Sequence, residues 1–253
     1  MKKAFYGLLV FAMCSLTTVP AVLANPTSKT PEVVFEKEEI KDQKSLFERA
    51  SKGITDLENS PFSPVGELEN TKTKLKEKVK TISTTQHVKS EKYPNGEVKD
   101  AYVTTSFAII PKHKSQTQNY TGSAGLEYDQ SQSSGQWDES ISVYAYSTIY
   151  WNKYNTDYFD LQKVDGGWSI QDSQMGVKDK RVRLAASGYK DYPAGYAEQY
   201  KDYYPSGLTY SYFAPSEWVP INSKATPRVF GMIAYCTIFD YTTSWNFTFK
   251  NQY

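Results

Sequence analysis

Hydrophobic and polar residues alternate regularly within residues 137–174, and this stretch predicts the centre of the fold. One face of its first segment, residues 140–151, carries the side chains of Ile141, Val143, Ala145, Ile149 and Trp151. The other face carries serine, threonine and tyrosine, while Ser147 is a polar exception on the apolar face. A period of two with β-branched and aromatic residues is typical of a strand whose two faces are differently solvated.

Two further strands are predicted directly after this one, at residues 158–164 and 168–173. Between them stand Asp165, Gly166 and Gly167. These residue types tolerate the positive φ that tight hairpin turns require. The stretch therefore predicts a β-meander of three strands.

Short strands separated by turn residues continue on both sides of the meander. They are expected at residues 84–89, 99–110, 176–187, 208–213, 228–238 and 244–250. Asn95-Gly96 predicts a turn before the second of these, and residues 240–243 join the last two into a hairpin. Many short strands at regular spacing are typical of a sandwich or an open barrel. We therefore expect residues 84–253 to form a mainly β domain, an antiparallel β-sandwich or open barrel.

A helical periodicity precedes this domain. Residues 36–59 predict an amphipathic helix from apolar positions at steps of three and four: Ile40, Phe47, Ala50, Ile54 and Leu57. Pro61 and Pro64 follow, and two prolines cannot continue a helix. Residues 65–83 predict a second helix from a heptad-like series: Leu68, Leu75, Val79 and Ile82. Residues 25–83 are therefore expected to be a helical or linker segment with an extended, proline-containing start.

The role of residues 25–83 has three alternatives. Two short helices with a thin apolar stripe are marginally stable alone. The segment can be a solvated spacer, which we favour, a removable pro-segment, or an element that docks on a partner or on the β domain.

The first 24 residues have the pattern of a secretory signal peptide. Lys2 and Lys3 precede an apolar run that is too short for an ordinary membrane span, and small residues lead up to Ala24. We expect cleavage after Ala24 and release of the mature chain. The alternative, a lipoprotein anchored through Cys14, fits less well because Met13 is not the small residue that normally precedes a lipid-modified cysteine.

Composition narrows the class of protein. After cleavage only Cys236 remains, so an intramolecular disulfide is impossible. A secreted, lysine-rich chain without a disulfide points to a bacterium, more often Gram-positive. The formal net charge of +1 gives no reason to expect a nucleic-acid partner, and we expect a monomer without a transmembrane segment in the mature chain.

Three motifs together carry a family resemblance. They are residues 137–150, residues 164–168 (Val-Asp-Gly-Gly-Trp) and residues 244–247 (Ser-Trp-Asn-Phe). In these motifs the chain resembles small secreted β-sandwich proteins of Gram-positive bacteria, over roughly residues 84–253. The resemblance implies the fold and export, and it assigns no catalytic residue.

Candidate catalytic residues are few, and we expect no enzyme, no cofactor and no metal site. The histidines His87 and His113 lack a zinc-binding spacing, and His87 is expected on a strand surface. Cys236 lies on the same face of its predicted strand as apolar residues, so it is expected to be buried. Residues 122–125 do not form a Gly-x-Ser-x-Gly nucleophile elbow. Carboxylates are plentiful, so a glycosidase pair stays open as an alternative: Asp160 and Asp172 could face each other across the predicted hairpin.

Tyrosines dominate the sequence after residue 136, in two groups. Tyr144, Tyr146 and Tyr150 form a stripe on the central strand, which we expect to be packed in the fold. Residues 188–206 are a tyrosine-rich loop whose aromatic residues alternate with charged ones, so not all of them can be core. Its candidate ligand-binding residues are Tyr189, Tyr192, Tyr196, Tyr200 and Tyr203.

Two functions follow as hypotheses. The first is a secreted, non-catalytic protein that binds a glycan, the cell wall or a protein through the tyrosine-rich loop. The alternative is a secreted bacteriocin-like or pore-forming effector acting on membranes. It rests on residues 112–136, whose serine, threonine and glutamine are also used by membrane-inserting hairpins, although a loop without regular structure is the simpler interpretation.

Overall fold

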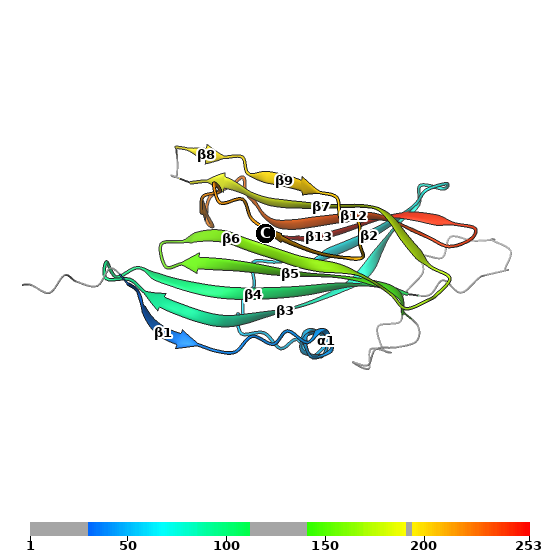
Figure 1. The fold of residues 1–253 in the computed structure, drawn as a ribbon. Coiled ribbons are helices and arrows are strands. Elements are labelled where there is room, and N and C mark those ends of the chain that lie inside the picture. The colour runs from blue at the N-terminus through cyan, green and yellow to red at the C-terminus, as the bar shows by residue number, and fades with distance from the viewer. Residues whose placement is uncertain (1–29, 112–140, 191–193) are drawn as a thin grey trace, which may run out of the picture.

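The computed structural model describes residues 30–111, 141–190 and 194–253. They form one short helix and thirteen strands (Figure 1). In chain order these are β1 (Glu32–Glu36), α1 (Gln43–Ser51), β2 (Val65–Asn70), β3 (Lys76–Lys92), β4 (Val98–Pro111), β5 (Ile141–Tyr154), β6 (Tyr158–Ile170), β7 (Gly176–Tyr189), β8 (Tyr196–Ala197), β9 (Tyr200–Tyr203), β10 (Thr209–Phe213), β11 (Ile221–Asn222), β12 (Val229–Phe239) and β13 (Ser244–Gln252).

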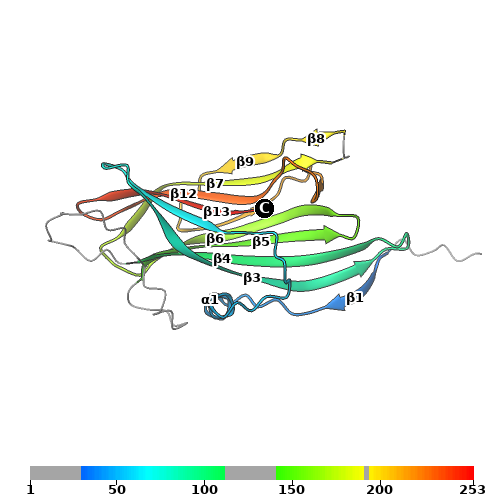
Figure 2. The same cartoon turned by 180° about the vertical axis from the view of Figure 1, so that it is seen from behind.

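The strands belong to one antiparallel sheet that curls into a half-barrel (Figures 1 and 2). Its order is β10-β6-β5-β4-β3-β2-β13-β12-β7-β8, and β9 also pairs with β7. We call β3–β6 with β10 the first arm, and β2, β13, β12, β7, β8 and β9 the second arm. The prediction of a mainly β, antiparallel fold is confirmed, and so is a short amphipathic helix before it.

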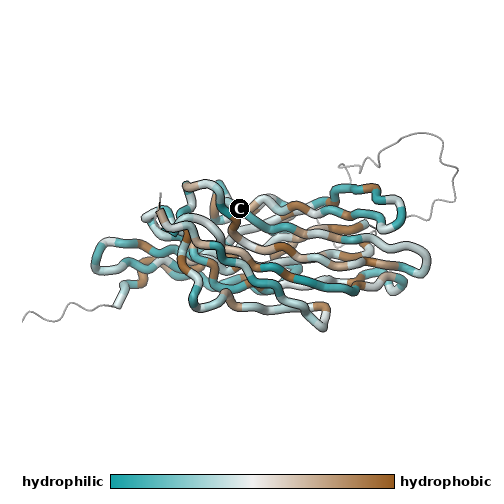
Figure 3. The backbone as a smooth tube through the Cα atoms, turned by 90° about the horizontal axis from the view of Figure 1, so that it is seen from above, coloured by the Kyte–Doolittle hydropathy of each residue, from teal (hydrophilic) through white to brown (hydrophobic). Residues whose placement is uncertain are grey.

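The core lies between the two arms. Along most strands apolar and polar residues alternate, so brown and teal alternate along the tube in Figure 3. Val143, Ala145, Ile149 and Trp151 of β5 face this core, as predicted. Ile141 packs instead on the opposite face, because the β4–β5 register shifts between Ile110 and Pro111 and reverses the alternation there.

Ser147, the polar exception on the inner face of β5, bonds across the core. The Asn251 side-chain amide, on β13 of the second arm, donates a hydrogen bond of 2.9 Å to the Ser147 hydroxyl. Both side chains are fully buried. A buried polar group is stable only with a partner, and here each arm supplies the partner for the other.

The tyrosine stripe of β5 is covered by the N-terminal segment rather than by a second sheet. α1 begins after its N-cap Asp42 and buries Leu46, Phe47 and Ala50 against the outer face of β3–β5. Tyr144 is buried in this contact and donates to Gln43 at 3.3 Å, while the Tyr150 hydroxyl donates to Glu39 at 3.1 Å. Figures 1 and 2 both show α1 and β1 beside β3.

The second predicted helix, over residues 65–83, is wrong. This segment contains β2 and the first half of β3, and β2 pairs with β13 on one side and β3 on the other. The heptad-like residues do not share one face: Leu68 is buried, whereas Leu75 is 68% exposed in the turn. Pairing with neighbours distant in sequence outweighs a weak local helical pattern. The predicted boundary at residue 84 lies inside β3.

The hairpin predicted at residues 165–167 is also wrong, because β6 runs through it without interruption. The two glycines are needed for close packing instead of a turn. A Cβ on Gly167 would lie 2.5 Å from the Leu208 carbonyl oxygen, and one on Gly166 would meet the Tyr210 ring. Glycine inside a strand often marks such a close approach of another chain segment.

The fold predicts the effect of truncation. A variant that begins at residue 84 loses β2 and half of β3, which join the two arms, so it should show no cooperative urea unfolding and no near-UV circular dichroism. A control that begins at residue 30, just before β1, should unfold like a chain that begins at residue 25. A cooperatively folding 84–253 fragment would contradict the role of β2 and β3 in joining the arms.

Candidate functional site

The tyrosine-rich segment predicted to bind ligand lies where the two ends of the sheet approach each other. β8 and β9 pair with β7 of the second arm, whereas β10 pairs with β6 of the first arm. The chain from residue 194 to residue 213 therefore crosses from one arm to the other. We call the line between β9 and β10 the seam.

A buried glutamine, Gln199, fixes this segment through hydrogen bonds to β7 and to Val219. Gln199 is 8% exposed. Its side-chain amide donates to the carbonyl oxygens of Ala186 and Val219, at 2.6 and 3.0 Å, and its side-chain oxygen accepts from the Val219 amide at 2.7 Å. Its backbone amide donates to Ser187 at 2.8 Å. These bonds leave the segment little freedom to shift.

An ion pair fixes the outer side of β9. The Arg183 guanidinium donates to both carboxylate oxygens of Asp202, at 2.9 and 2.6 Å. These hydrogen bonds hold the pKa of the Asp202 carboxyl below its usual range. The same guanidinium lies 5.0 Å from the ring centre of Tyr200, which is 54% exposed. A paired, two-pronged contact of this kind fixes orientation as well as position.

The other predicted tyrosines divide into two settings. Tyr189 and Tyr196 are opposite each other on β7 and β8, with ring centres 5.4 Å apart and planes at 88°, and Tyr196 is 45% exposed. Tyr203 stacks on Tyr212 across the seam at 4.0 Å and 11°, and its hydroxyl donates to the Phe213 carbonyl oxygen at 3.3 Å. Tyr192 lies outside the described residues.

The exposed rings on this segment include two that were not among the predicted site residues. Tyr204 is 72% exposed and Phe213 is 71% exposed. We call Tyr196, Tyr200, Tyr204 and Phe213 together the aromatic edge. The sequence did contain a signal for the exposure of Phe213. In β10 this residue lies on the same strand face as the exposed Thr209 and Ser211, where a large apolar side chain is unexpected.

Cys236 is buried, as predicted. It is 4% exposed on β12, and burial raises the pKa of its thiol well above the ordinary value. A thiol in this setting remains protonated and is a poor nucleophile.

His87 is not the simple strand-surface residue that was predicted. Its ring lies between those of Phe35 and Tyr102, with ring centres 4.5 and 4.8 Å away. Its Nε2 is 2.9 Å from the Ser90 hydroxyl, which donates to Asp100 at 2.6 Å. Because the single hydroxyl proton of Ser90 goes to the carboxylate, the histidine does not activate this serine, and the cluster fastens strands together. His113 lies outside the described residues.

The carboxylate pair expected for a glycosidase does not form. Asp160 lies at the start of β6, where burial raises the pKa of its carboxyl, and Asp172 follows the end of the same strand. Ten strand residues at about 3.3 Å each separate them by roughly 30 Å, far beyond the spacing of a glycosidase pair.

Within the residues that the structure describes, three or more His, Cys, Asp or Glu side chains do not gather as metal ligands would.

A comparison of the chain with models of protein families, with curated proteins and with solved structures found no match.

The contacts predict which tyrosines carry structure. Tyr203→Ala removes a stacked pair at the seam and should lower the free energy of unfolding by about 1–3 kcal/mol. Tyr200→Ala removes an exposed ring and should change it by about 1 kcal/mol or less. Urea unfolding followed by tryptophan fluorescence measures both. Equal losses for the two variants would show that the exposed ring is as important to the fold as the stacked one.

Proposed function

We propose that this chain is an exported, non-catalytic binding protein whose aromatic edge attaches to a polymeric ligand, either a glycan or a protein of the cell surface. One observation carries the proposal: exposed rings stand on a backbone segment fixed by Gln199 and by the Arg183–Asp202 pair. Tyrosine and phenylalanine give a large contact area at a small cost in side-chain entropy. A fixed backbone lowers the ordering cost of binding further.

The chemistry of the edge suits a glycan best. The flat C–H faces of sugar rings pack on aromatic rings, and the tyrosine hydroxyls can bond sugar hydroxyls. Two lysines lie near the edge: the Lys163 ammonium lies 5.5 Å from the ring centre of Phe213, and the Lys201 ammonium lies 5.4 Å from the ring centre of Tyr203 at the adjoining seam. Lys163 already pairs with Asp165 at 2.7 Å, so Lys201 is the one of the two that would add affinity for a polymer with acidic groups.

Export is part of the proposal. The first 24 residues have the charged start, apolar run and small residues of a signal peptide, and cleavage after Ala24 would release the chain outside a bacterium, most simply a Gram-positive one. Among the described residues no helix is long and apolar enough to cross a membrane.

The alternative function, action on membranes, has one supporting observation. β4 and β5 are adjacent, and their pairing extends to Pro111 and Ile141, next to the two ends of residues 112–140. That connection is where a membrane-inserting hairpin would have to start. The segment itself lies outside the described residues.

The aromatic edge predicts binding to cell walls. The triple variant Tyr200→Ala, Tyr204→Ala and Phe213→Ala should bind insoluble peptidoglycan at least about tenfold more weakly, because a single interface anchor is often worth about 2 kcal/mol. Co-sedimentation measures the affinity, and a glycan array and labelled bacterial surface protein test the other ligand classes.

Tyr241→Ala is the matched control, because Tyr241 is 88% exposed but lies in the turn between β12 and β13. It should bind like the unchanged protein. If the folded triple variant retains full affinity for every ligand that the unchanged protein binds, the aromatic edge is not the binding surface.

Membrane action predicts a different result. If the alternative is right, the mature chain should release dye from anionic liposomes, and a variant in which a short Gly-Ser linker replaces residues 112–136 should not. We expect no release from the mature chain, in line with the binding function. Dye release that depends on residues 112–136 would instead establish the alternative.

A further inference from the structure

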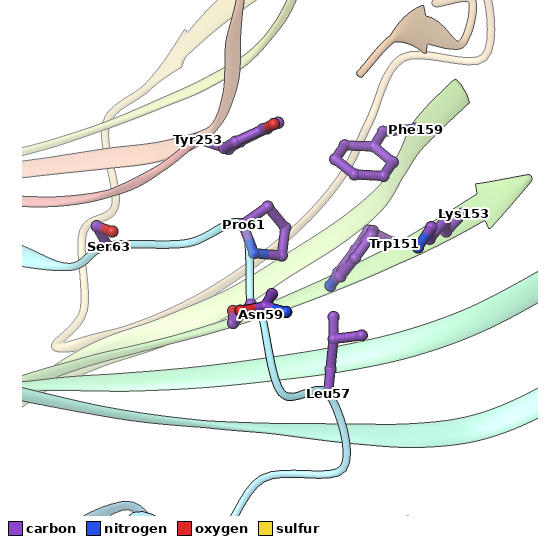
Figure 4. A pocket seen from close by; sticks show the side chains of 9 residues that line it. Leu57, Asn59, Pro61, Ser63, Trp151, Lys153, Phe159 and Tyr253 are labelled. Atoms are coloured by element: carbon purple, nitrogen blue, oxygen red, sulfur yellow. The ribbon is translucent and has the colours of Figure 1, made fainter. Parts of the chain in front are cut away.

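A second candidate site lies at one end of the half-barrel, between β5, β6 and the C-terminal residue. It is a cavity of about 470 Å³ that shares no lining residue with the aromatic edge (Figure 4). Its main lining side chains are Leu57, Pro61, Trp151, Lys153, Phe159 and Tyr253. Cavities of a few hundred Å³ are the usual size of small-molecule sites.

Three aromatic rings from different parts of the chain form one wall. The ring centre of Phe159 lies 5.0 Å from that of Trp151 and 5.6 Å from that of Tyr253. Pro61 lies between Trp151 and Tyr253 in the view of Figure 4. Within this wall, Trp151 and Phe159 are 1% and 6% exposed and form its deep part, the aromatic floor of the cavity. Tyr253 is half-buried and lies at the rim. The cavity therefore offers aromatic faces and edges to a ligand.

The wall is held in place before any ligand arrives. The Trp151 indole donates to the buried Thr104 hydroxyl at 3.0 Å. The Tyr253 hydroxyl donates to the Ser223 carbonyl oxygen at 3.2 Å, and the Arg228 guanidinium lies 4.0 Å from the Tyr253 ring centre. Backbone hydrogen bonds of 2.8 and 3.1 Å join Tyr253 to Phe230. Such support lowers the ordering cost of binding.

Lys153 gives the cavity its charge. Its ammonium makes no ion pair with any residue that the structure describes, although its cross-strand neighbour is Asp100. That carboxylate already accepts from Ser90 at 2.6 Å and lies 3.5 Å from His87. Among the side chains that line the cavity, that of Lys153 is the one with a charge. An anion is therefore the complementary charge.

We propose that this cavity binds a small carboxylate that carries one ring, with the ring against Tyr253 and Phe159 and the carboxylate on Lys153. The cavity volume is large enough for a ligand that has one ring and a short side chain. The same chemistry is offered by an aromatic acid and by a sugar acid such as a hexuronate, so the experiment includes both. The site is independent of the aromatic edge.

The test uses the mature chain and two matched pairs of probes. Phenylacetate is compared with phenylacetamide, and glucuronate with glucose, by titration calorimetry and ligand-observed NMR. At least one acid should bind, and its neutral partner should bind about tenfold more weakly or worse, because hydrogen bonds to a charged group are stronger than neutral ones. Whichever acid binds identifies the source.

Variants locate the binding. Lys153→Met should reduce the affinity for the acid to that for its neutral partner, Lys153→Arg should restore part of it, and Tyr253→Ala should abolish binding of the ring. Lys250→Met, which removes an exposed lysine of β13 outside the cavity, should have no effect. Absence of binding by both acids at 10 mM, roughly the weakest affinity of interest, overturns the proposal. Equal binding of acid and neutral probe, or affinity unchanged in folded Lys153→Met and Tyr253→Ala proteins, overturns it as well.

Discussion

The backbone ladder of the half-barrel ends at β10 on one side and at β8 on the other, so side chains must close the seam between its two ends. The Tyr203–Tyr212 stack bridges it, and Gln199 joins β7 to the chain at Val219. Ile221, fully buried, packs between β6 and β7. A curled sheet buries a core only if its arms stay together, so the rest of the fold depends on these contacts.

The same requirement explains why an aromatic surface lies at the seam. A segment that crosses from one arm to the other must place some residues inward to close the sheet, and strand alternation then places their neighbours outward. In β10, Tyr212 is of the first kind because it stacks on Tyr203, and Phe213, next to it, is of the second. The exposed rings are therefore supported by the contacts that close the half-barrel, which makes them a firm surface for a ligand.

The cavity at the end of the half-barrel arises differently. There Tyr253 and the segment around Pro61 lie against the ends of β5 and β6 and leave a cavity between them. The aromatic floor belongs to the main core, since Trp151 also stacks on Tyr102 at 4.9 Å. The proposed ligand would thus contact the core directly, whereas a ligand of the aromatic edge would contact only the surface.

The sequence by itself determined the strand class, most of the strands after residue 98, the inner face of β5 and the burial of Cys236, because these depend on local alternation and composition. The tertiary structure alone decided the rest. β2 is a strand because β13 and β3 pair with it, and Gly166 is in a strand because the Tyr210 ring needs its space. Whether a tyrosine is exposed or stacked likewise depends on segments far apart in sequence, whose approach no local pattern encodes. The same holds for the cavity that Lys153 lines together with Trp151, Phe159 and Tyr253.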